Sequence, residues 1–167
     1  MSAEVLQAKT HIENVKTGIQ NSDRKAVAEG VSKALADTYA LYLKTQGFHW
    51  NVVGPLFYGL HKLTEVQYEE LADAVDVIAE RIRALGHPAP ASFSQFAKLT
   101  QIKDADGTQS GEVMINALIA DHESMSRSFR EVIELADSVG DAATADLFTG
   151  RLHVHEKAVW MLRALVS

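Results

Sequence analysis

The sequence predicts an all-α fold: a four-helix bundle whose middle connection is long and carries a short extra helix. Long proline-free stretches hold apolar residues at helical spacing, and strand-like alternation is nearly absent. The only prolines, Pro55, Pro88 and Pro90, fall between the expected helices. With 167 residues, 47% of them hydrophobic and 23% charged, the chain can bury the core of one domain.

Four long helices are expected, over about residues 23–52, 56–85, 112–138 and 142–166, with a short amphipathic helix over about 92–99. Asn21 or Ser22 suits the N-cap of the first helix, and Asp141 suits that of the last. Gly86 supplies a stop for the second helix. We therefore expect a bundle domain over residues 22–167, preceded by an N-terminal tail over residues 1–21.

The lengths of the connections predict how the helices pair. The turns near residues 51–55 and 139–141 are short, so the helices on either side of each turn should form antiparallel hairpins. The connection over residues 86–111 is long enough to cross the full length of the bundle. A crossover is therefore expected to join the two hairpins.

Composition excludes several classes of function. There is no cysteine, which rules out disulfides, thiolate metal sites and thiol catalysis. No apolar run approaches the roughly 18 residues needed to cross a bilayer, and the first residues do not resemble a secretory signal. We expect a cytoplasmic protein with no membrane segment. The formal net charge of −6 should repel nucleic acid unless a basic arm or patch compensates.

The second long helix carries the residues that point to chemistry. Taking His61 as zero and turning about 100° per residue places Glu65 near ~40°. By the same count Asp76 lies near ~60° and Glu80 near ~100°. A helix normally gives one such stripe to the core, where three carboxylates would be costly without metal ions or other cations. The stripe therefore predicts a metal site.

Distance divides this stripe into two halves. His61 and Asp76 are fifteen residues apart, about 22 Å along a helix, whereas metal–ligand bonds are about 2 Å long. The His61/Glu65 pair therefore cannot share an ion with the Asp76/Glu80 pair of the same helix. Two antiparallel copies of the helix across a twofold axis would join each half to the partner's other half, and such dimers are common.

His49 lies just before the turn into the second helix, and therefore near His61. Two imidazoles and several carboxylates suit iron, manganese or zinc rather than copper(I). Taken alone, either pair is more typical of a solvated helix face, His49 of a capping or packing residue, and Trp50 of a core or interface aromatic. The combination of these residues is what favours a metal site.

Three stretches of the chain resemble the Dps family of ferritin-like proteins. They are His49-Trp50-Asn51-Val52-Val53-Gly54 followed by Leu60-His61 and Glu65, the segment from Val75 to Arg81 ending in Leu85-Gly86, and the segment from His155 to Arg163. The resemblance covers about residues 22–166. It implies a ferritin-like four-helix bundle with a short helix in the crossover.

The resemblance also implies a function. Family members form a shell of twelve subunits, a dodecamer built from twofold dimers, with a di-iron ferroxidase site at each twofold interface. The implied activity is oxidation of Fe(II), preferably by hydrogen peroxide, with storage of the ferric iron and protection against oxidative damage. By position, five residues would bind iron: His49, His61 and Glu65 from one subunit, and Asp76 and Glu80 from its partner. Trp50 would lie beside the site, for electron transfer, radical trapping or simple packing.

The chain departs from the family pattern in two places. Many relatives have Asp at the position of Glu65, whose longer side chain can shift the second iron position. Family members bind DNA through a lysine-rich tail, whereas the four cations of residues 1–25 face three acidic residues here. A nearly neutral tail releases few counterions on binding phosphate, so strong DNA binding is not expected. A DNA-compacting, nucleoid-associated protein is the alternative function, and a helical interaction module without metal is the third.

Acidic residues and histidines elsewhere give weaker signals. Asp137, Asp141 and Asp146 gather at the last turn, where the resemblance implies an iron-attracting threefold pore and where helix capping is an equal explanation. His153 and His155 are two residues apart and point to different faces, so we expect structural histidines with hydrogen-bond partners. His122, between two acidic residues, is expected at the surface.

Overall fold

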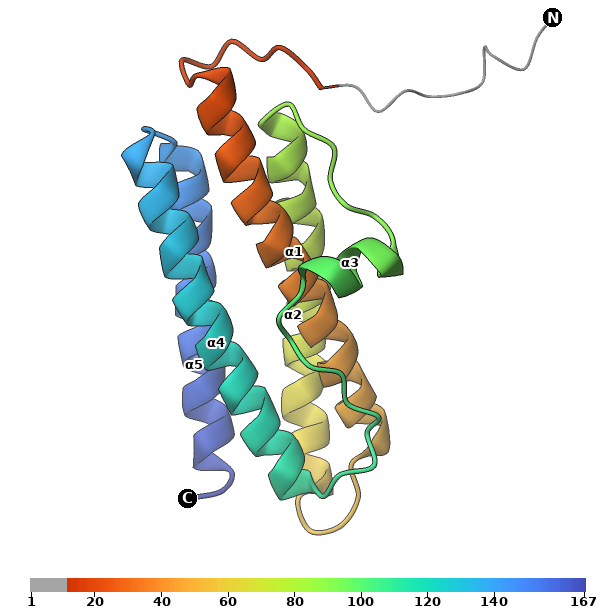
Figure 1. The fold of residues 1–167 in the computed structure, drawn as a ribbon. Coiled ribbons are helices and arrows are strands. Elements are labelled where there is room, and N and C mark those ends of the chain that lie inside the picture. The colour runs from red at the N-terminus through yellow and green to blue at the C-terminus, as the bar shows by residue number, and fades with distance from the viewer. Residues whose placement is uncertain (1–11) are drawn as a thin grey trace, which may run out of the picture.

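In the computed structural model, which describes residues 12–167, two helical hairpins pack side by side as a bundle (Figure 1). The first hairpin pairs α1 (Asn21–Asn51) with α2 (Phe57–Ala84), and the second pairs α4 (Gly111–Ser138) with α5 (Ala142–Ala164). The crossover carries α3 (Phe93–Leu99) and runs along the bundle beside α1 (Figure 1). No strand occurs among these residues, so the predicted all-α bundle with a helical crossover is confirmed.

The helices end close to the predicted positions, but one predicted cap is wrong. α1 begins at Asn21 after Gln20, without a side-chain cap bond. The amide oxygen of Asn21 instead accepts a hydrogen bond from the buried guanidinium of Arg24, which leaves neither Asn21 nor Ser22 as N-cap. At α5 the predicted cap is confirmed, because the carboxylate of Asp141 accepts a hydrogen bond from the Thr144 amide at 3.1 Å.

The end of α2 shows why Gly86 is needed. Its φ is +89°, a conformation that glycine adopts readily and other residues rarely do. A Cβ atom at this position would lie 2.6 Å from the backbone oxygen of Glu13, which approaches closely because the Glu13 amide donates to the Gly86 carbonyl. Residues 12–20 are thereby held against the end of α2. Residues 1–11 of the predicted tail lie outside the part of the chain described, and the domain boundary stays a prediction.

One apolar core lies between the hairpins. Val27, Val31 and Leu35 of the predicted α1 stripe are at most 1% exposed, while Tyr39 and Tyr42 are only half-buried. Burying side chains of this size stabilises the fold by roughly 1.5–3 kcal/mol each. No helix of residues 12–167 is long and apolar enough to span a membrane.

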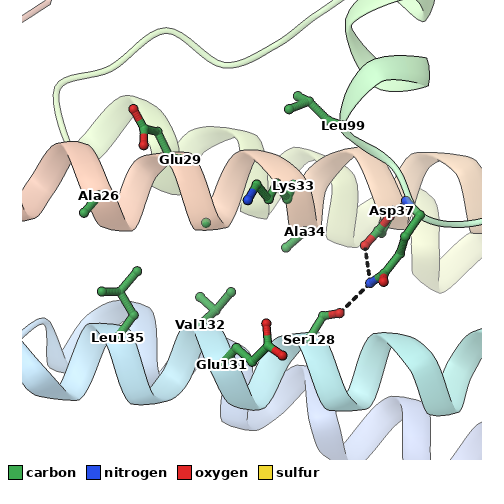
Figure 2. Close-up of a pocket in the computed structure, with 12 residues that line it drawn as sticks. Ala26, Glu29, Lys33, Ala34, Asp37, Leu99, Ser128, Glu131, Val132 and Leu135 are labelled. Atoms are coloured by element: carbon green, nitrogen blue, oxygen red, sulfur yellow. Dashed lines mark hydrogen bonds between the residues drawn. The ribbon is translucent and has the colours of Figure 1, made fainter.

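Hydrogen bonds to α1 fix the crossover in place. The buried carboxylate of Asp37 accepts from the Thr100 hydroxyl and from the Gln101 amide, both at 2.8 Å. The Gln101 side chain then bridges Asp37 and Ser128 of α4, beside a crevice of about 550 Å³ between α1 and α4 (Figure 2). The crossover therefore links both hairpins and holds α1, which carries part of the candidate site, in a fixed position relative to α4.

Candidate metal centre

His49 and His61 meet where α1 turns into α2. His49 is buried in the last turn of α1, and His61 is half-buried near the start of α2. The two imidazoles are stacked with ring centroids 3.9 Å apart and an interplanar angle of 16°. The predicted proximity of these histidines is confirmed, and it arises because the turn of residues 52–56 folds α2 back along α1.

Reciprocal hydrogen bonds hold these two rings. Nδ1 of His49 lies 2.9 Å from the carbonyl oxygen of His61, and Nδ1 of His61 lies 2.9 Å from the carbonyl oxygen of His49. A carbonyl oxygen can only accept, so each ring carries its proton on Nδ1 and donates it. Each Nε2 therefore keeps a free lone pair. Metal-binding histidines commonly use this outer hydrogen bond to fix the ring and its tautomer.

Glu65 lies one turn beyond His61, beside a lysine. Lys62 Nζ is 2.8 Å from Glu65 Oε2, and this hydrogen bond together with the lysine charge lowers the pKa of Glu65. The carboxylate is therefore ionised near neutral pH. Its second oxygen has no hydrogen bond within the described part of the chain, so it can bind a cation.

Asp76 and Glu80 lie apart from the histidines, farther along α2. Both are exposed, and neither makes a hydrogen bond or ion pair among residues 12–167. Fifteen residues of helix separate His61 from Asp76, roughly 22 Å. Within this range no three His, Asp or Glu side chains gather closely enough to hold a metal ion. A single chain therefore brings His49 and His61 together, whereas Asp76 and Glu80 lie farther along α2.

Aromatic residues surround the histidine pair. Phe57 stacks on His61 with centroids 5.1 Å apart, and Tyr68 meets the His49 ring edge-on at 5.1 Å. Trp50, in contrast, is 63% exposed and has no aromatic neighbour in the described part. The sequence-based reasoning missed Phe57 and Tyr68, although Tyr68 stands two helical turns beyond His61 and so on the same side of α2.

A second histidine pair is buried between α4 and α5, away from this site. His122 is 2% exposed and His155 is 0% exposed, with their Nδ1 atoms 2.8 Å apart. His122 was expected at the surface, and that expectation is wrong because its neighbours Leu118 and Met125 place it on the buried face of α4. His155 is hydrogen-bonded as predicted, whereas His153 is exposed and has no hydrogen bond among the described residues.

An ion pair extends this buried cluster toward α2. Arg151 pairs with Glu70 through both terminal guanidinium nitrogens, and one of these two nitrogens lies 3.3 Å from Nε2 of His155. Because arginine only donates, Nε2 of His155 accepts and its Nδ1 carries the proton donated to His122. Burial lowers the pKa of His122 to about 3 and lowers that of His155 well below its ordinary value. Both rings are therefore neutral.

The acidic residues of the last turn divide into two kinds. Asp141 is 2% exposed and bonded to Arg81 of α2 and to Thr144, so it serves as a cap and a link between hairpins. Asp137 and Asp146 are exposed. Of the three residues considered for a pore, only these two present free carboxylates at the surface.

Comparison with known sequences gives matches along nearly the whole chain. The family model of the ferritin-like domain matches residues 28–167. The chain is 36% identical over 143 residues to DNA protection during starvation protein 2 of Bacillus anthracis, covering 86% of this chain and 98% of that protein. It is 38% identical over 155 residues to an uncharacterised low-temperature-induced protein of Nostoc, covering 92% and 87%.

Solved structures agree with the sequence matches. A Dps protein from Bacillus brevis superposes with a TM-score of 0.85 at 32% identity, covering 92% of this chain and 100% of that one. A Dps protein from Vibrio cholerae O1 superposes with a TM-score of 0.87 at 30% identity, covering 93% and 100%. The latter is described as a member of a broad superfamily of ferritin-like diiron-carboxylate proteins.

Proposed function

This chain belongs to the Dps family of ferritin-like proteins, and from that premise we propose that it is a ferroxidase and iron-storage protein. It oxidises Fe(II), preferably with hydrogen peroxide, at sites shared by two subunits, and it stores the ferric product. Five residues bind the iron: His49, His61 and Glu65 of one subunit, with Asp76 and Glu80 of the other.

The observation that carries this proposal is the orientation of the histidine pair. Reciprocal hydrogen bonds at Nδ1 leave the Nε2 atoms of His49 and His61 free to bind a cation, next to the ionised Glu65. The acidic half, Asp76 and Glu80, is exposed on the same helix and too far away to join them. A second copy of α2 in antiparallel orientation would supply it.

The donor set fits ferrous iron as the substrate. Imidazole nitrogen and carboxylate oxygen bind iron, and the carboxylates favour the ferric product because they neutralise its higher charge. In the overall reaction two ferrous ions each lose one electron, the O–O bond of one peroxide molecule breaks, and two protons from solvent complete two water molecules. The protein residues hold the ions and place the oxidant between them.

The proposed dimer follows from the shared site, and the proposed dodecamer follows from membership of the Dps family. A dimer completes two such sites, and twelve subunits form a hollow dodecamer that encloses the mineral. Val77, next to Asp76 on α2, is 50% exposed in the single chain, and the proposed twofold contact would cover it. A cytoplasmic location, with access to ferrous iron, belongs to the same proposal.

Anaerobic loading with ferrous iron followed by a small addition of peroxide tests the activity. Ferric absorbance should rise rapidly in the wild type, and it should stay near the uncatalysed rate in H49A/H61A and in D76N/E80Q. The control H153A/D104N changes an exposed histidine and an exposed aspartate away from the site and should behave as wild type. Full activity in either site variant would refute the ligand assignment.

DNA compaction is the second candidate, because relatives of this chain are named DNA protection during starvation proteins. The charge distribution disfavours it. The net charge of the chain is −6. Residues 1–25 contain four cations, and one of them, Arg24, is only 4% exposed and donates hydrogen bonds to the carbonyls of Ile19 and Leu85. This arginine cannot reach a phosphate without giving up those bonds.

A further inference from the structure

Three tyrosines form a row that begins at the histidine pair. The ring of Tyr68 meets His49 with centroids 5.1 Å apart, Tyr42 lies 6.4 Å from Tyr68, and Tyr39 lies 5.9 Å from Tyr42. The row, which we call the tyrosine row, therefore has no step longer than 6.4 Å between centroids. Of the four tyrosines in the chain, only Tyr58 stands outside it.

The far end of the tyrosine row lies against the part of α2 that carries the other half-site of the same chain. Tyr39 lines a mostly apolar cavity of about 340 Å³ together with Val75 and Ala79 of α2. Val75 directly precedes Asp76, and Ala79 directly precedes Glu80. The row thus runs along the α1–α2 hairpin from the histidine half-site toward the acidic half-site, which belong to two different sites of a dimer.

The hydroxyl groups of the row are not used for folding. None of the three hydroxyls makes a hydrogen bond within residues 12–167, and none is among the buried polar atoms that lack a partner. Water therefore reaches them in the single chain. Phenylalanine would pack equally well in these edge-to-face pairs, so the hydroxyls add contact with solvent rather than packing. A phenol in contact with water can also give its proton to solvent when it loses an electron.

We propose that Tyr68, Tyr42 and Tyr39 carry an oxidising equivalent from one iron site of the dimer to the other. The proposal rests on the function above, because it requires ferrous iron at both ends of the row. This transfer is needed when a site holds only one ferrous ion. Peroxide then takes one electron from that ion, and its O–O bond breaks to give hydroxide and a hydroxyl radical.

The tyrosine row completes the reaction without releasing that radical. The hydroxyl radical takes a hydrogen atom from Tyr68, which forms water and a tyrosyl radical. Tyr42 gives one electron to the Tyr68 radical and Tyr39 then gives one to Tyr42, while each phenol exchanges its proton with the water at its hydroxyl, so the radical moves to Tyr39. A ferrous ion at the second site gives the last electron, and a proton from water restores the phenol. The sum is two ferrous ions oxidised per peroxide molecule, with one water and one hydroxide formed after uptake of one proton.

Y42F interrupts the tyrosine row in the middle while keeping the aromatic contacts. Shells are loaded anaerobically with less than one ferrous ion per site, and peroxide is then added with a hydroxyl-radical spin trap present. In the wild type we expect about two ferrous ions oxidised per peroxide and little trapped radical. In Y42F this ratio should fall toward one, trapped radical should rise several-fold, and the tyrosyl signal in electron paramagnetic resonance should persist longer.

Matched variants separate a relay from packing. Y58F removes the exposed tyrosine outside the row and should behave as wild type, while Y68F should lose the early tyrosyl signal and release the most trapped radical. At two ferrous ions per site Y58F should oxidise iron as the wild type does. Identical radical yield and tyrosyl lifetime in Y42F and wild type at low loading would overturn the relay alone. A wild type that shows no peroxide-driven iron oxidation would overturn the proposed function as well.

Discussion

At the scale of single residues, the hydrogen bonds of His49 and His61 decide what the site can bind. Each ring is held by the backbone of the other, so the pair is oriented before any ion arrives. Loss of an outer hydrogen bond to a metal-binding histidine costs roughly 10–100-fold in affinity. H61A removes a ligand but keeps the backbone carbonyl of residue 61 that holds the His49 ring. Because loss of a ligand costs more than loss of its outer hydrogen bond, the variant should weaken anaerobic ferrous binding by more than that factor, measured by calorimetry. The exposed H153A should bind as wild type, and equal affinities for H61A and H153A would contradict this assignment.

The ion pair between Lys44 and Asp121 gives a prediction about stability. Lys44 Nζ lies 2.5 Å from Asp121 Oδ2, and the two side chains are 6% and 16% exposed. K44M leaves the carboxylate without its partner, and breaking such a pair costs about 3–5 kcal/mol. Burial already raises the pKa of Asp121, so protonation will limit the loss to about 3 kcal/mol.

Urea unfolding of K44M and of the double variant K44M/D121L measures this effect. The single variant should unfold at clearly lower urea, and the double variant should recover much of the loss because it leaves no buried charge. Equal stability of K44M and the wild type would show that the pair contributes nothing.

At the scale of helices, the buried histidine pair between α4 and α5 makes stability depend on pH. His122 remains neutral in the fold down to about pH 3, whereas an unfolded chain protonates it near pH 6.5. Its contribution is therefore complete above pH 6.5 and is lost as the pH falls below that value. The loss is about 1.4 kcal/mol per pH unit for this residue, and His155 adds to it in the same direction.

Thermal unfolding between pH 7 and pH 5 tests this link between α4 and α5. The midpoint should fall steeply in the wild type, and the slope should be shallower in H122Q, which cannot take up the proton. An H122Q slope equal to that of the wild type would place the acid sensitivity elsewhere.

The helices themselves could be predicted because their signals are local. Apolar spacing, Gly86 and Asp141 set the helix ends within about two residues of the observed ones. The predicted N-cap of α1 was wrong because the Asn21 side chain accepts a hydrogen bond from Arg24, which also donates to the distant Leu85 carbonyl. His122 was misplaced although Leu118, Met125 and Phe129 repeat around it at helical spacing, so that signal was present in the sequence.

The tyrosine row could not be predicted in the same way. Tyr42 meets Tyr68 only because α1 and α2 pair in one particular register, which the turn of residues 52–56 sets. Helical arithmetic places residues on one helix and says nothing of which residues face each other across two. The same limit explains why His49 could be placed near His61 but the stacking of their rings could not be predicted.

At the scale of the whole molecule, the shared site needs at least a dimer, and the proposed iron store needs a closed shell of twelve subunits. Size-exclusion chromatography with light scattering should give a species about twelve times the 18.3 kDa chain. A monomer would leave each half-site incomplete, because no complete metal site forms within the described chain. A purely monomeric protein with full ferroxidase activity would therefore contradict the shared site.

Charge at the same scale predicts weak binding to DNA. The negative surface and the nearly neutral residues 1–25 release few counterions, so any complex should dissociate as salt rises. In gel-shift experiments we expect little retardation at about 0.15 M salt, and any band seen near 0.02 M should disappear on adding salt. Tight binding at moderate salt would favour the compaction function instead.

The shared site is tested most directly by mixing two inactive proteins. Subunits of H49A/H61A and of D76N/E80Q are co-assembled in equal amounts, so that about half of the dimers contain one of each. In every mixed dimer one site lacks both histidines and both acidic ligands. The other site combines the intact histidines of one subunit with the intact acidic pair of its partner. The shared site predicts recovery of about one quarter of the wild-type rate of ferrous oxidation. A co-assembled shell no more active than either variant alone would contradict it, since a site built within one chain cannot be restored by its neighbour.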